Sequence, residues 1–256
     1  MVNLAEEHEC NKMTTLFYMW SPFRESLIKS HHFYVEQSKK RLLSQFENLN
    51  VEADKYAQEW LDERSHLFDP DRHDPSDFYE HAYDASIEFH QMLSDMRNRA
   101  ILSIISGIFH EWDKQLRDWL VKEVKHWNNS EAVEKAIWKV NFEDIIDLVD
   151  SAIVKTKMQN YYQSLDKCRL LVNAYKHGEG DSFQKLKSNY PEFFRNLGLG
   201  NLGAYFYSHE DIQVSEKHID EFSNAIVDFW KSIPQYVHDS DEIDVPNWFE
   251  KAYKKG

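Results

Sequence analysis

Residues 75–127 read PSDFYEHAYDASIEFHQMLSDMRNRAILSIISGIFHEWDKQLRDWLVKEVKHW, and this stretch decides the fold class. Its apolar side chains recur three, four or seven positions apart, the spacing that places them on one side of an α-helix. They are Phe78, Ala82, Phe89, Leu93, Met96, Ala100, Ile104, Ile108, Trp112, Leu116 and Leu120. Asp74 is placed to cap this helix, and Pro75 suits its first position because proline has no N–H to leave unpaired. The spacing predicts one long helix that ends close to Trp127.

Helical spacing continues on both sides of this stretch. Before it, the apolar positions 42, 46, 49, 53, 56 and 60 predict a first long helix from about Arg24 to His66, weakened near residues 48–50. Two Asp-Pro pairs in residues 69–75 then break the helix and form a loop. After it, capping residues predict helices over about 131–139, 142–158, 165–177 and 215–233. The predicted capping residues are Ser130, Asn141, Gly178, Ser182 and Ser215, with Pro234 ending the last helix.

The composition agrees with a helical protein. The 256 residues include 7 glycines and 6 prolines, and 14% are aromatic, which disfavours β-sandwiches and glycine-rich nucleotide folds. We predict an all-α bundle of about five to seven helices, with a weak strand pattern at residues 204–207 and with Trp60, Trp112, Trp119, Trp138 and Trp230 in the core. The predicted parts are an N-terminal helical arm with the Asp-Pro loop (1–75), a helical bundle (76–234) and an acidic tail (235–256).

Charge and cysteine content exclude several classes of protein. Acidic residues number 44 and basic residues 30, which gives a net charge of −14 and excludes a nucleic-acid clamp that is basic throughout. The two cysteines form no CxxC motif, which excludes a disulfide framework or a zinc ribbon and favours the cytoplasm. The apolar stretches are too short to span a bilayer, so we expect no membrane partner. Two Glu-x-x-His pairs, at positions 63/66 and 123/126, lie at predicted helix ends, and we predict no metal and no cofactor.

Polar residues gather at the end of the helix predicted for residues 165–177. Arg169, Asn173 and His177 are four residues apart, so they form one ridge about 12 Å long. Residues 161–200 contain six basic and four acidic side chains, whereas the rest of the chain is strongly acidic. An anion would therefore be drawn to this region first.

The sequence here resembles a known family. Residues 168–180 read CRLLVNAYKHGEG, and with Ser182, Leu186 and Pro191 they resemble the closing motif of the HEPN superfamily of helical proteins. Residues 99–111, RAILSIISGIFHE, are similar to an earlier helix of that family. The resemblance implies a metal-independent ribonuclease site where two protomers pair, of the kind found in toxin–antitoxin and antiphage systems. It places Asn173 at the family's polar position, His177 at its histidine and Glu111 at its acidic position.

One position departs from the family pattern. Val172 stands where the family has arginine, so Arg169 or Lys176 would have to supply the cation. Metal-free RNA cleavage needs a base for the 2′-hydroxyl and a cation near the phosphoryl oxygens. We therefore predict His177 as the acid or base, Arg169 as the phosphate ligand and Asn173 as a positioning group. The further residues expected to contact substrate are Lys176, Glu111, Lys185 and Lys187.

Two other interpretations stay open. The ridge can be a simple helix cap, in which Asn173 and His177 satisfy backbone carbonyls. The chain can also be a non-catalytic interaction module whose HEPN site has degenerated at Val172. The expected partners are a second copy of the chain, RNA, and a protein such as an antitoxin or another defence component.

Overall fold

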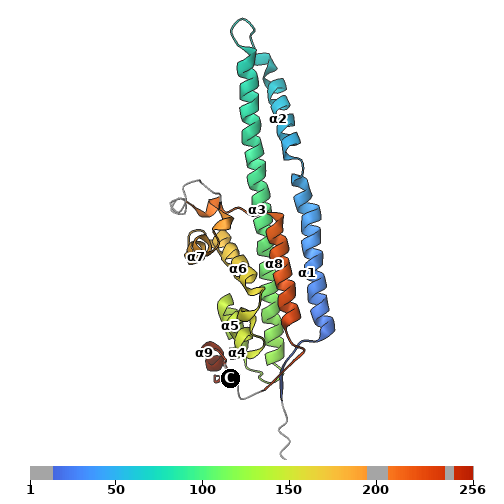
Figure 1. The fold of residues 1–256 in the computed structure, drawn as a ribbon, viewed down its shortest axis with the longest axis vertical. Coiled ribbons are helices and arrows are strands. Elements are labelled where there is room, and N and C mark those ends of the chain that lie inside the picture. The colour runs from blue at the N-terminus through green and yellow to red at the C-terminus, as the bar shows by residue number, and fades with distance from the viewer. Residues whose placement is uncertain (1–13, 195–206, 240–244, 256) are drawn as a thin grey trace, which may run out of the picture. The chain divides into compact units, whose positions relative to one another are not determined.

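The computed structural model describes residues 14–194, 207–239 and 245–255, and the chain is predominantly helical (Figure 1). The prediction of an all-α fold is confirmed. The described helices are α1 (Ser21–Leu42), α2 (Leu49–Arg64), α3 (Pro75–Val124), α4 (Glu131–Lys139), α5 (Phe142–Ala152), α6 (Tyr162–His177), α7 (Asp181–Asn189), α8 (Glu216–Ser232) and α9 (Asn247–Tyr253).

The chain divides into two compact units. Unit 1 consists of Met1–Lys29, His110–Gln163 and Asn224–Gly256, and unit 2 of Ser30–Phe109 and Ser164–Ser223. Helices α1, α3, α6 and α8 each contribute residues to both units. The boundaries predicted at residues 75 and 234 stay a prediction.

Unit 1 is built around aromatic side chains. Trp112 and Trp230 are buried, and the ring of Trp112 meets that of Phe229 edge to face at 5.0 Å. Arg117 is also buried; it binds Asp113 at 2.8 Å and donates to the backbone carbonyls of residues 137 and 140. These bonds satisfy a charge that would be costly to bury alone. The tryptophan prediction is wrong at Trp138, which is 45% exposed.

A small antiparallel sheet in unit 1 was not predicted. Strand β1 (Thr15–Tyr18) pairs with β2 (Tyr236–His238), and Trp119 and Trp127 donate to backbone carbonyls of β1. The strands are only four and three residues long and come from opposite ends of the chain, so no local pattern links them. The strand pattern predicted at residues 204–207 lies almost wholly outside the described residues.

Unit 2 contains a two-helix hairpin, which we define as residues 49–100: α2, the loop after it and the first half of α3. The two helices lie side by side (Figure 1). Their contact is aromatic, since Tyr56 stacks on Phe89 at 4.4 Å and Trp60 meets Phe78 at 6.1 Å. The buried residues of this hairpin are small: Ala53, Ala82 and Ser86.

Most helix boundaries follow their predicted caps. Asp74 accepts a hydrogen bond from the Ser76 backbone, while Ser130 and Asn141 accept from the first turns of α4 and α5. Gly178 ends α6 with φ = 70°, a conformation that glycine adopts at little cost. The prediction of Ser182 as an N-cap is wrong, because α7 begins at Asp181 with Gly180 at the N-cap.

Two predicted helices are shorter or broken. The helix expected over about 24–66 is divided into α1 and α2 by a 3₁₀ turn at Leu43–Phe46, slightly before the expected weak point. Helix α5 ends at Ala152, because the chain turns there and forms a separate 3₁₀ turn at Thr156–Met158. Across the described parts of the chain, we find no helix with the length and apolar character needed to span a bilayer.

Candidate functional site at the end of helix α6

Helix α6 carries the predicted polar ridge opposite a tightly packed face. Its buried residues are Leu165, Cys168, Leu170, Leu171, Val172 and Ala174. Val172, at the position where the predicted resemblance expects an arginine, is 1% exposed. This position is therefore part of the core and cannot supply the cation that was expected there.

Arg169 is held by a carboxylate on its own helix. Its Nη2 and Nε atoms lie 2.7 and 3.2 Å from Oδ1 of Asp166, and the Arg169 side chain is only 11% exposed. The Tyr190 hydroxyl donates to the other carboxylate oxygen of Asp166 at 3.3 Å. Burial, and next the negative charge of Asp166, raise the pKa of Tyr190 to about 12, so it stays a hydrogen-bond donor at neutral pH. Asp166 therefore joins α6 to Tyr190, which follows α7, while it holds the Arg169 guanidinium on the same helix.

The last turn of α6 is open to solvent. Lys176 and His177 are exposed, and Asn173 is half-buried one turn before His177. Because Gly178 turns the chain directly after His177, the imidazole lies at the carboxyl end of the helix. Of the ridge, only His177 is exposed, and the exposed Lys176 lies next to it in the chain.

The remaining predicted residues lie on other helices. Lys185 is exposed on α7, and the Lys187 ammonium group lies over the Phe183 ring at 5.2 Å. Glu111 is exposed on α3 and accepts a hydrogen bond from Gln115 at 3.1 Å. Glu111 belongs to unit 1, whereas the other predicted site residues belong to unit 2.

A second histidine, absent from the prediction, lies near the end of α6. His209 begins a 3₁₀ turn (His209–Asp211) that is fixed by a capping box between Ser208 and Asp211. Atoms of its ring are 3.8 Å from the position that a Cβ on Gly178 would take, and its Nδ1 lies 3.8 Å from a carboxylate oxygen of Glu179. The capping-box residues could have predicted this turn from the sequence, but no local signal places it beside α6.

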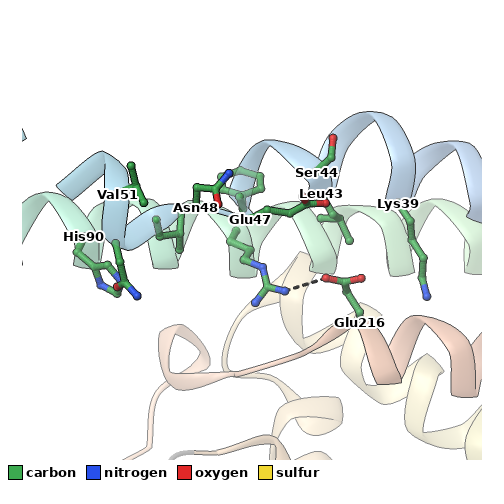
Figure 2. A pocket seen from close by; sticks show the side chains of 12 residues that line it. Lys39, Leu43, Ser44, Glu47, Asn48, Val51, His90 and Glu216 are labelled. Atoms are coloured by element: carbon green, nitrogen blue, oxygen red, sulfur yellow. Dashed lines mark hydrogen bonds and ion pairs between the residues drawn. The ribbon is translucent and has the colours of Figure 1, made fainter. Parts of the chain in front are cut away.

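Unit 2 also contains a polar pocket of about 470 Å³ beside the break between α1 and α2 (Figure 2). Two of its cations are already paired: Arg97 lies 2.8 Å from Glu216, and Lys39 lies 2.6 Å from Asp220. A smaller pocket of about 290 Å³ shares Leu49 and Arg97 with it. Neither pocket is lined by a predicted site residue.

Comparisons with known proteins add no relative to this picture. Searches with family models, against curated proteins and against solved structures found no match to the chain.

Proposed function

We propose that this chain is a HEPN-like, metal-independent endoribonuclease of the cytoplasm that acts as a homodimer. The observation that supports the proposal is the open end of α6, where Lys176 and His177 are both exposed and Asn173 lies one turn earlier. Imidazole can exchange a proton near neutral pH, and an ammonium group can stabilise charge on phosphoryl oxygens. In a two-fold dimer, the cation of one protomer could approach the histidine of the other.

The structure favours Lys176 over Arg169 as the cation in this proposal. The Arg169 guanidinium is occupied by Asp166 and largely buried, whereas the Lys176 side chain is in contact with solvent. Use of Arg169 would require the Asp166 pair to open, and this would leave a half-buried carboxylate without its ion pair. We therefore assign acid–base catalysis to His177 and phosphate binding to Lys176.

The test is RNA cleavage in EDTA by the purified chain, on structured and on unstructured RNA. We expect His177→Ala to lower the rate at least about 100-fold and Lys176→Ala to lower it by about tenfold or more. His126→Ala and Lys139→Ala are matched controls at exposed positions of unit 1, and they should leave the rate unchanged. Cleavage that survives in His177→Ala would remove this histidine from the mechanism.

A second candidate is a non-catalytic interaction module. It is favoured by the burial of Val172 and by the Asp166–Arg169 ion pair, since the chain has a core residue and a fastened arginine where a nuclease needs a free cation. Under this alternative the wild-type chain cleaves none of the RNAs, and sedimentation gives the mass of a monomer.

A further inference from the structure

The outer face of α3 in unit 2 carries an exposed apolar stripe. Tyr79, Tyr83 and Ile87 are four residues apart, and their exposed fractions are 65%, 63% and 50%. Each step of four residues advances by about 40° beyond a full turn, so the three side chains cover a sector of about 80°. Such a row of large apolar groups in water is typical of a surface that another helix covers.

An acidic stripe runs directly beside the apolar one. Glu80, Asp84 and Glu88 each follow a member of the apolar stripe by one residue, which places them about 100° further around α3. All three are exposed, and their carboxylates make no ion pair or hydrogen bond with another described residue. Like charges four residues apart repel along a helix, so the stripe lowers the stability of α3 when it stands alone.

Helix α2 leaves both stripes uncovered. It packs against Phe78 and Phe89, which lie roughly 130° around α3 from Tyr83. The buried residues of the hairpin (49–100) are all small, so its two helices lack the large apolar core that usually stabilises paired helices. A third helix laid along the outer face would supply the missing apolar burial.

We propose that the face of α3 from Tyr79 to Glu88 docks a basic amphipathic helix of a partner protein. The negative charge of the hairpin favours a basic partner over a second copy of this chain. Residues 49–100 contain 13 acidic and five basic side chains, a net charge of −8, which repels a second copy of the same hairpin. A helix with an apolar stripe beside a Lys or Arg stripe would cover Tyr79, Tyr83 and Ile87 and neutralise the three carboxylates in the same orientation. This inference does not depend on the proposed nuclease activity.

The test uses synthetic peptides and the full chain. The probe is a labelled helix-forming peptide with a leucine stripe and an adjacent lysine stripe at four-residue spacing, and its control is a scrambled peptide of the same composition. Fluorescence anisotropy should show that the wild-type chain binds the patterned peptide at least about tenfold more tightly than the scrambled one. Equal binding of the two peptides, or no binding of the patterned peptide at micromolar concentrations, would overturn the proposal.

Matched variants distinguish binding at this face from attraction by the overall negative charge of the chain. The variant Glu80→Lys/Asp84→Lys/Glu88→Lys should lose about tenfold or more in affinity for the patterned peptide. The variant Glu25→Lys/Glu36→Lys/Asp54→Lys changes the net charge equally at exposed positions of α1 and α2, and it should bind within about threefold of the wild type. Equal losses in the two variants would contradict a specific site.

Two further measurements test whether α3 stays folded in the triple variant and whether this face binds a second copy of the chain. A peptide with glutamates in place of its lysines should bind the Glu80→Lys/Asp84→Lys/Glu88→Lys variant more tightly than it binds the wild type, and this gain requires a folded α3. Sedimentation should show no self-association through this face. If the wild type self-associates and the triple variant does not, the occupant is a second copy and the proposal fails.

Discussion

His31 on α1 is a buried histidine whose surroundings keep it neutral. Its Nε2 lies 2.9 Å from the Ser223 hydroxyl, and burial, aided by the neighbouring His32, lowers its pKa from 6.5 to about 4. Cys168 on α6 shows the same effect in the opposite direction, because burial raises the pKa of its thiol. At both residues the fold suppresses the charged form.

The neutral state of His31 predicts a loss of stability in mild acid. In the unfolded chain this histidine binds a proton as the pH falls through about 6.5, whereas in the folded chain it does so only near 4. The unfolded state therefore binds more protons between these values, and we expect the free energy of unfolding to fall by about 2 kcal/mol from pH 7 to pH 5 through this residue. Urea titrations should show a smaller loss in His31→Gln.

The control for this prediction is His32→Gln, which changes the exposed neighbour. It should keep most of the pH dependence, because the burial of His31 is unchanged. An equal pH dependence in the wild type and in His31→Gln would show that His31 binds its proton equally well in the folded and unfolded chain, which contradicts the prediction.

Burial of Cys168 predicts an inert thiol. The side chain is fully buried and its thiolate is disfavoured, so thiol reagents should not reach it in the folded protein. A Cys10→Ser variant leaves Cys168 as the single thiol of the chain. We expect labelling of this variant only in denaturant, and rapid labelling under native conditions would contradict the packing described for α6.

At the scale of elements, the sequence predicts helices well where the signal is local. Asp74, Ser130 and Asn141 bond within three residues of their own positions, so their capping roles can be inferred from spacing alone. The pairing of β1 with β2 and the place of His209 beside Gly178 depend on contacts between distant segments. The ion pair between Arg169 and Asp166 is local, because the two residues are three positions apart. The hydrogen bond from Tyr190 to Asp166 joins distant segments, so no local pattern predicts it.

The turn between α6 and α7 offers a matched pair of glycines. Gly178 has φ = 70°, where an L side chain is strained, so Gly178→Ala should lower the free energy of unfolding by about 1 kcal/mol or more. Gly180 has φ = −100°, and a Cβ added there would meet open space, so Gly180→Ala should change stability by less than about 0.5 kcal/mol. Equal effects in thermal unfolding would contradict the left-handed end of α6.

At the scale of the whole molecule, burial and charge are unevenly distributed. The hairpin of residues 49–100 holds 13 of the 44 acidic side chains but buries few residues, whereas α5 alone buries Ile145, Ile146, Leu148, Val149 and Ala152. Composition gives the total charge, but only the helical register shows that Glu80, Asp84 and Glu88 form a row on one side of α3.

This contrast predicts a gradient of local stability. Backbone amides of α2 and of the first half of α3 should exchange with solvent faster than those of α5, because few buried contacts oppose their opening. Hydrogen-exchange mass spectrometry of the full chain measures this directly. Equal protection of the hairpin and of α5 would mean that the hairpin is stabilised by contacts other than those described.

The burial of Val172 also bears on how this chain can change over evolutionary time. A single Val172→Arg substitution would reproduce the arginine of the HEPN pattern in the sequence but would place a guanidinium among packed side chains of α6, at a cost of several kcal/mol. The substitution is therefore expected to unfold or strongly destabilise the chain. A new cation on α6 has to arise at a position that already faces water.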